Sequence, residues 1–164
     1  MQIQTIDNYL PSNLFNNIRD ILFDPKHNFP WFFADFVGSK KDKSDFYFYH
    51  LLYEHERKCS AFFEKLVHPL IRRQNFTYLY RAKCNLYTQK SSKIHTAFHV
   101  DMKKKHKVLL YNINTNNGFT MFENGAKVSS KENQAILFDG KLKHRSVAQT
   151  DKIVRININI NYDF

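Results

Sequence analysis

Cysteine and long apolar runs are scarce in this sequence, and each scarcity excludes a class of protein. The two cysteines, Cys59 and Cys84, are too few for a disulfide framework and match no paired metal-ligand spacing. We expect both to be free thiols in a reducing compartment. No segment approaches the roughly 18 uninterrupted apolar residues of a membrane span, and Met1–Thr5 has neither a basic leader nor an apolar run. We therefore expect a cytoplasmic protein with no membrane partner.

What the sequence does contain fits one packed domain with one cleft. Its 164 residues are 43% hydrophobic and 16% aromatic, and they show no internal repeat and no low-complexity tract. We predict a single domain, residues 1–164, composed of a helical support region (1–76) and a β-sheet core (77–162). Nothing in the sequence indicates an oligomeric state.

The charge balance is strongly basic, with 25 Lys and Arg against 15 Asp and Glu, a net charge of +10. Such a charge can attract nucleic acid, anionic lipid or an acidic polypeptide. It can equally reflect a biased genome, because Lys, Asn and Ile have AT-rich codons and are abundant here. The densest basic patch is Lys-Lys-Lys-His-Lys at residues 103–107.

The N-terminal part has the spacing of helices. From Ser12, apolar residues at i, i+4, i+7 and i+8 predict a helix that ends near Asp24 and buries Leu14, Ile18, Ile21 and Leu22. A second helix is predicted from about Glu54 to Arg73, with Phe62, Phe63, Leu66, Val67, Leu70 and Ile71 on its apolar face. We interpret the aromatic segment 29–55 between them as core, with the lining of a substrate cleft as the alternative.

From residue 77 the hydrophobic period changes to two, which is typical of strands. Turn signals at Asn117-Gly118, Asn124-Gly125 and Asp139-Gly140 separate the segments. The predicted strands are 78–88, 97–101, 107–114, 119–123, 126–129, 134–139, 144–148 and 152–161. Many short strands after N-terminal helices predict a mainly β fold, the double-stranded β-helix or jelly roll, with the helices supporting one sheet.

The last strand alternates strictly between apolar and polar residues. Val154, Ile156, Ile158 and Ile160 form one row, and Arg155, Asn157, Asn159 and Asn161 form the other. An ordinary amphipathic strand would turn the polar row to solvent. However, two amphipathic helices need a sheet to cover. We therefore favour an arrangement in which the apolar row packs on the helices and the polar row points into the mouth of the barrel.

One histidine and one carboxylate stand two positions apart in His99-Val100-Asp101. On an extended chain their side chains share a face about 6.6 Å apart, close enough to hold one metal ion. About one such pair is expected by chance in this composition, so the triplet needs support from its context. A third ligand from a later strand, His144, would complete a triangle of two imidazoles and one carboxylate, which suits non-haem Fe(II).

These features together resemble the Fe(II)/2-oxoglutarate-dependent dioxygenases, specifically the prolyl 4-hydroxylase-like group of bacteria and phages. The resemblance covers residues 77–162 well and the helices loosely. It rests on the order and spacing of Arg81-Ala82-Lys83-Cys84-Asn85-Leu86-Tyr87, His99-Val100-Asp101, Tyr111-Asn112-Ile113-Asn114, Phe138-Asp139-Gly140 before His144, and Arg155. If the chain is phage-encoded, its compartment would be the host cytoplasm.

The resemblance implies a role for each matched residue. His99, Asp101 and His144 match the metal triad, and Arg155 matches the basic residue that binds the C5 carboxylate of 2-oxoglutarate. Tyr87 matches a tyrosine that hydrogen-bonds this carboxylate, and Asn112, where relatives often have a second tyrosine, is a candidate contact. Phe119 is expected to form an apolar wall beside the co-substrate. The implied cofactors are Fe(II), 2-oxoglutarate and O2.

The implied reaction is hydroxylation of a substrate C–H bond with release of succinate and CO2. A peptidyl proline is our first choice of substrate, and a free amino acid or small metabolite is the next. A nucleic-acid base ranks lower, because alkylation-repair relatives usually carry a second arginine six residues beyond the co-substrate arginine, where this chain has Asn161. A non-catalytic metal-binding jelly-roll module is the alternative outside enzymes.

Overall fold

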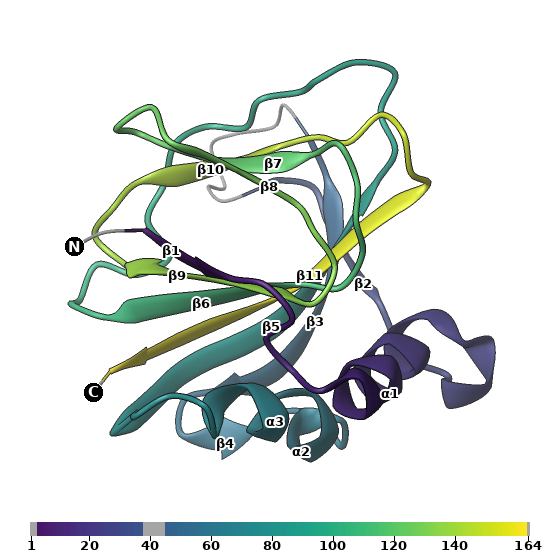
Figure 1. The fold of residues 1–164 in the computed structure, drawn as a ribbon, viewed down its shortest axis with the longest axis vertical. Helices are drawn as coiled ribbons and strands as arrows, with labels where there is room; N and C mark the ends of the chain where they lie inside the picture. Colours follow the sequence, from purple (N-terminus) through teal and green to yellow (C-terminus); the bar gives the residue numbers. More distant parts are fainter. Residues whose placement is uncertain (1–2, 38–44, 164) are drawn as a thin grey trace.

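The structure is a computed structural model that describes residues 3–37 and 45–163. Strands and short helices alternate along the first half, and strands alone make up the second half (Figure 1). In chain order the elements are β1 (Gln4–Ile6), α1 (Ser12–Phe23), the 3-10 helix η1 (Pro25–His27), β2 (Phe32–Ala34), β3 (Tyr47–Glu54), β4 (Arg57–Lys58), α2 (Phe63–Leu66), α3 (His68–Ile71), β5 (Tyr78–Thr88), β6 (Lys107–Asn112), β7 (Phe119–Phe122), β8 (Lys127–Ser129), β9 (Gln134–Asp139), β10 (His144–Val147) and β11 (Val154–Asp163).

The strands form a large sheet and a small one. The large sheet has the order β1-β9-β6-β11-β5-β3-β2, with β4 paired to β3, and the small sheet has the order β10-β7-β8. Figure 1 shows the small sheet on one side of the large sheet and helices α1, α2 and α3 on the other. The predicted mainly β fold, with helices that support one sheet, is therefore confirmed.

Two clusters of buried apolar side chains join these layers. The larger cluster lies between the helices and the large sheet, where Ile18 of α1 and Leu70 of α3 join the same core as Ile158 of β11. The smaller cluster joins the two sheets through Phe122 of β7 and Phe138 of β9, whose rings meet edge to face at 5.0 Å. The large sheet is thus buried on both faces, which fixes the register of its strands.

The two rows of side chains on β11 face the directions that the sequence predicts. Ile156, Ile158 and Ile160 belong to the larger core, next to the helices. Arg155 and Asn157, from the polar row, line a cavity between the two sheets. The polar residues of β5 lie directly opposite in the antiparallel register, with Arg155 beside Tyr87, Asn157 beside Asn85, Asn159 beside Lys83 and Asn161 beside Arg81.

The predicted helix from Glu54 to Arg73 is wrong. Its first part is a hairpin between β3 and β4, and the two turn residues, His55 and Glu56, have φ of 52° and 59°. Positive φ at both central residues is the conformation of a tight type I′ hairpin turn. The rest is two one-turn helices, because Pro69 has no N–H to donate and its ring clashes with the preceding turn. The buried residues Leu66, Val67, Leu70 and Ile71 are nevertheless those predicted.

Two smaller predictions also fail. Leu14 of α1 is 36% exposed, and Phe15 takes its place on the buried face with Ile18, Ile21 and Leu22. Residues 97–101 do not form a strand, since only His99 makes a β-bridge, to His144. The remaining predicted strands match observed strands within about two residues at each end.

The two cysteines are unpaired, as expected, with Cys84 buried in β5 and Cys59 exposed. Within residues 3–37 and 45–163, no helix has both the length and the apolar character needed to span a bilayer.

Replacement of Gly140 by alanine is expected to destabilise the fold by about 1–3 kcal/mol, because a Cβ there would overlap the imidazole of His106. His106 is 1% exposed and its Nδ1–H donates to the carbonyl of Lys104 at 2.8 Å, so the ring has little room to move. Urea denaturation measures the change. In a His106→Ala background the same substitution should cost much less, and an equal cost in both backgrounds would contradict this explanation.

Candidate metal centre

His99 and His144 are held together by their backbones. Each donates its N–H to the carbonyl of the other at 3.0 Å, which links the segment after β5 to the start of β10. The Nδ1 of His99 lies 3.3 Å from the carbonyl of Ala97, and that of His144 lies 3.2 Å from the carbonyl of Leu142. Because a carbonyl can only accept, Nδ1 carries the hydrogen in both rings. Each Nε2 therefore keeps a lone pair for a metal.

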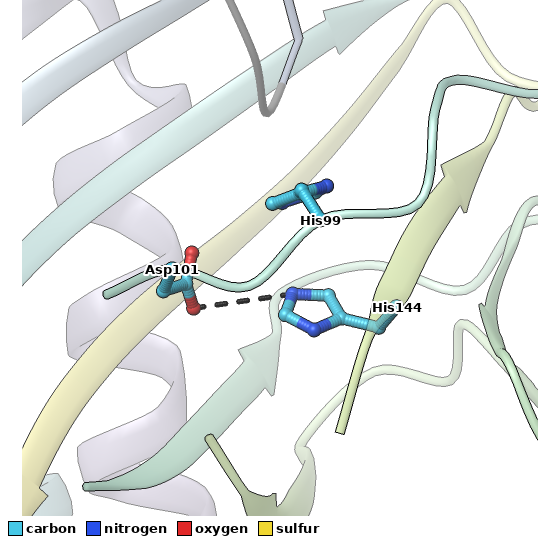
Figure 2. Close-up of side chains that lie close together, drawn as sticks. All are labelled: His99, Asp101 and His144. Atoms are coloured by element: carbon cyan, nitrogen blue, oxygen red, sulfur yellow. Dashed lines mark ion pairs between the residues drawn. The ribbon is translucent and has the colours of Figure 1, made fainter. Parts of the chain in front are cut away.

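Asp101 completes a triangle with the two histidines. One ligand atom from each of the three side chains lies within 4.8 Å of the others, and Nε2 of His144 is 3.9 Å from Oδ2 of Asp101 (Figure 2). Figure 2 shows the His144 ring and the Asp101 carboxylate directed toward one another, with His99 beside them. Two imidazoles and one carboxylate that leave coordination positions open are the donor set of non-haem Fe(II) sites.

Burial and neighbouring charges favour the metal-binding forms of Asp101 and His99. Burial alone would raise the pKa of Asp101, but the neighbouring His144 and Arg81 hold it well below its usual range, so the carboxylate is ionised at neutral pH. Burial, and then the adjacent His144, lower the pKa of His99. This imidazole is therefore neutral at neutral pH, as a metal ligand must be.

The triangle opens into a cavity of about 460 Å³ between the sheets. Its walls come from both sheets and from the segment that carries His99 and Asp101. The side of the large sheet contributes Tyr87, Asn85 and Asn157, and the small sheet contributes Thr120 and Ser146. A cavity of this size has room for a small organic acid beside a metal ion.

Arg155 lies in the wall of this cavity as a buried cation. It is 2% exposed, and no ion pair to a carboxylate is found among residues 3–37 and 45–163. Its Nη1 donates to Ser146 Oγ and to the carbonyl of Val147 at 3.1 Å each, and its Nη2 donates to Thr120 Oγ1 at 3.4 Å. The Nε–H has no partner in the described chain. A buried guanidinium without a counter-charge is costly, which points to an anion that binds beside it.

Tyr87 lies next to this guanidinium, whose Cζ is 5.7 Å from the centre of the tyrosine ring. Burial raises the pKa of Tyr87 far above its usual value, so its hydroxyl remains a hydrogen-bond donor at neutral pH. The sequence therefore placed Tyr87 and Arg155 at the same cavity as the predicted triad, and the structure brings these five residues together.

Asn112 and Phe119 are not among the residues that line the cavity. Asn112 is buried in β6, and its Nδ2 donates to Gln134 Oε1 at 3.4 Å. Its contact with the co-substrate stays a prediction. The expected apolar wall at Phe119 is wrong, because alternation along β7 turns Thr120 inward and leaves the Phe119 ring near His95.

Sequence reasoning missed several polar side chains that support the site. Thr120 and Ser146, which bind Arg155, had no signal in the sequence. Asn159 and Asn161, which contact Asp101, belong to the polar row that was predicted to face inward, and that alternation could have identified them. Arg81 contacts Asp101 from β5.

No protein-family model matches the chain, and no curated protein matches it significantly. Solved structures do match. A prolyl-4-hydroxylase of Pseudomonas putida is 10% identical with a TM-score of 0.65, over 99% of this chain and 92% of that one. A prolyl hydroxylase of Trichoplax adhaerens, in complex with a hypoxia inducible factor peptide fragment, is 15% identical with a TM-score of 0.65, over 98% and 83%. SnoK, a non-haem α-ketoglutarate-dependent carbocyclase of nogalamycin biosynthesis, is 10% identical with a TM-score of 0.69, over 98% and 78%.

At these identities the likeness is one of fold. This chain has the double-stranded β-helix shared by 2-oxoglutarate-dependent oxygenases over nearly its full length, and its own His99, Asp101 and His144 form a metal-binding triangle in it.

Proposed function

We propose that this protein is an Fe(II)- and 2-oxoglutarate-dependent dioxygenase that hydroxylates a C–H bond of its substrate and releases succinate and CO2. The observation that carries the proposal is a single cavity that holds both the triangle of His99, Asp101 and His144 and the buried, unpaired guanidinium of Arg155. A metal ligand set and a carboxylate-binding cation in one cavity suit a co-substrate with a chelating end and a carboxylate end.

Different residues of the cavity would bind the metal ion and the co-substrate. The Nε2 atoms of His99 and His144 and the carboxylate of Asp101 would hold Fe(II). When bound, iron with 2-oxoglutarate supplies the oxidising chemistry toward O2. Arg155 binds the C5 carboxylate through its guanidinium, and Tyr87 donates to the same group. Thr120 and Ser146 accept from the other guanidinium nitrogens and so fix its orientation.

A peptidyl proline is our first choice of substrate. The resemblance is to prolyl hydroxylases, and the Trichoplax neighbour was solved with a peptide fragment. A small metabolite is the second candidate, favoured by the likeness to SnoK, a carbocyclase of nogalamycin biosynthesis. Succinate formation from Fe(II) and 2-oxoglutarate, even without added substrate, separates both from a non-catalytic metal-binding module, which would form none.

The basic residues after Asp101 bear on the choice of substrate. Lys103, Lys104 and Lys105 are all exposed, and Nζ of Lys104 lies 3.6 Å from the centre of the Tyr80 ring. They begin two residues after the metal ligand Asp101, although none of the three is among the residues that line the cavity. We propose that they attract an acidic polypeptide substrate.

Replacing Lys103, Lys104 and Lys105 by serine is expected to flatten the salt dependence of kcat/KM for a peptide substrate and to leave 2-oxoglutarate affinity unchanged. Electrostatic attraction is screened over about 8 Å at physiological salt, so kcat/KM of the unmodified protein should fall as salt rises. The measurement is peptide-stimulated succinate formation across a salt series, with acidic proline-containing peptides.

A matched control replaces three lysines near the helices, Lys26, Lys58 and Lys65, by serine. This change alters the net charge equally and should keep the salt dependence. If proline-containing peptides stimulate no succinate formation while a free amino acid or single-stranded DNA does, the peptide assignment is wrong.

A further inference from the structure

Of the three ligands in the triangle, Asp101 is the one whose backbone is not paired with another segment of the described chain. Asp101 lies in the long segment between β5 and β6, outside every strand, and the nearest backbone pairing is the single bridge between His99 and His144. His144, in contrast, lies at the start of β10. The orientation of the Asp101 carboxylate therefore depends on what its side chain contacts.

Three side chains from the large sheet donate hydrogen bonds to this carboxylate. The Nδ2 atoms of Asn159 and Asn161 both lie 3.1 Å from Oδ2, and Nη2 of Arg81 lies 3.3 Å from Oδ1. Arg81 also braces one of the asparagines, since its Nε–H donates to Oδ1 of Asn161 at 3.2 Å. Rotation of the carboxylate away from this orientation would break at least one of the three hydrogen bonds.

The donors themselves are fixed by the sheet. Asn159 and Asn161 share one face of β11, which is paired on both sides, with β5 and with β6. Arg81 lies on β5 directly opposite Asn161 in the register. Asn161 is fully buried and Asn159 is 6% exposed, so bulk water has little access to either residue. The position of the carboxylate is thereby set by two central strands of the fold.

We propose that Asn159 and Asn161, the latter braced by Arg81, are positioning residues that orient Asp101 for metal binding. The inference rests on the proposed function in that it takes His99, Asp101 and His144 as the metal centre. Hydrogen bonds to a ligating carboxylate fix it before the metal arrives, and their loss typically costs about 10–100-fold in metal affinity.

The test measures Mn(II) affinity of the metal-free protein by calorimetry in Asn161→Leu and Asn159→Leu. Each change removes one donor to Asp101 without altering any charge, and each is expected to weaken Mn(II) binding by about 10–100-fold. Substitution of Arg81 is less decisive, because removing a cation near the metal would by itself favour metal binding.

Asn157→Leu is the matched control. Asn157 is buried on the same face of β11 and lines the same cavity, but its Oδ1 accepts from Asn85 at 2.8 Å and it has no hydrogen bond to Asp101. This variant should bind Mn(II) like the unmodified protein. The visible absorption spectrum of the Co(II)-loaded protein gives a second readout, which should change in the Asn161 and Asn159 variants and not in the Asn157 variant.

The outcomes separate this inference from the proposed function. If the unmodified protein binds no Mn(II), the metal centre itself fails. If it binds Mn(II) and the Asn159 and Asn161 variants bind equally tightly with unchanged Co(II) spectra, the positioning role is overturned, even if these variants melt at a lower temperature. Should Asn161→Leu fail to fold, the Asn159→Leu measurement decides alone.

Discussion

Replacement of His144 by alanine is expected to abolish metal binding and all Fe(II)-dependent succinate formation. The ring supplies the ligand that comes from the small sheet, and two remaining ligands, His99 and Asp101, would leave an incomplete metal site. The backbone bridge between residues 99 and 144 does not involve the side chain, so the fold should persist. Calorimetry with Mn(II) and an assay for succinate measure the two losses.

His95→Ala is the matched control for this experiment. His95 is exposed, lies in the same segment as His99, and makes a comparable β-bridge, to Val147. Its replacement should leave metal affinity unchanged. His106, which is not a member of the triad either, is a less clean control because its ring is buried and its loss leaves a cavity. Loss of metal in His95→Ala, with His144→Ala still active, would contradict the assignment of the triad.

The sequence predicted those parts of the site that lie on strands with strict alternation of apolar and polar residues. Alternation along residues 154–161 separates the row of Arg155 from the row of Ile156, and the need to cover two helices decides which row faces inward. The same argument applied to β5 places Tyr87 opposite Arg155. Strand alternation is a property of neighbouring residues, so it can be read without knowledge of the pairing.

The parts that were missed depend on pairing between distant segments. Thr120 of β7 and Ser146 of β10 both contact Arg155 at the start of β11, and β7 pairs with β10. Thr120 is 35 residues and Ser146 is 9 residues from Arg155 along the chain. No local pattern encodes such a meeting. The false helix from Glu54 has a different cause, since the apolar spacing at residues 62–71 is real but Pro69 and the turn at His55 and Glu56 override it.

Specificity in folds of this kind depends on loops, and the candidate segments in this chain are 35–50 and 88–96. Part of the first, residues 38–44, lies outside the described residues. Its described end contributes Tyr47 and Tyr49 to the wall of the cavity, so this segment does border the site. The aromatic segment 29–55 therefore contributes both to the core and to the lining of the cavity. Trp31 packs against the core, and Tyr47 and Tyr49 line the cavity.

Replacement of Arg155 by alanine is expected to weaken 2-oxoglutarate binding by roughly 30-fold to several thousandfold. Truncating one partner of a buried, hydrogen-bonded charge pair costs about 2–5 kcal/mol, and Arg155 is buried with no carboxylate of the described chain to pair with. Tyr87→Phe should cost less, about 1.5–3 kcal/mol, because it removes one hydrogen bond to a charged group. Calorimetry of the Mn(II)-loaded protein with 2-oxoglutarate measures both without turnover.

Arg145→Ala controls for the loss of a positive charge near the cavity. Arg145 follows His144 on β10 and also lines the cavity, but its guanidinium lies over the Phe98 ring at 4.3 Å and contacts the Met121 sulfur at 3.1 Å. Its replacement should leave 2-oxoglutarate affinity unchanged, because its charge has no part in the predicted carboxylate site. Equal losses in both variants would indicate general attraction rather than a specific pair. An unchanged affinity in Arg155→Ala would place the co-substrate elsewhere, since no other fully buried cation is found in the described chain.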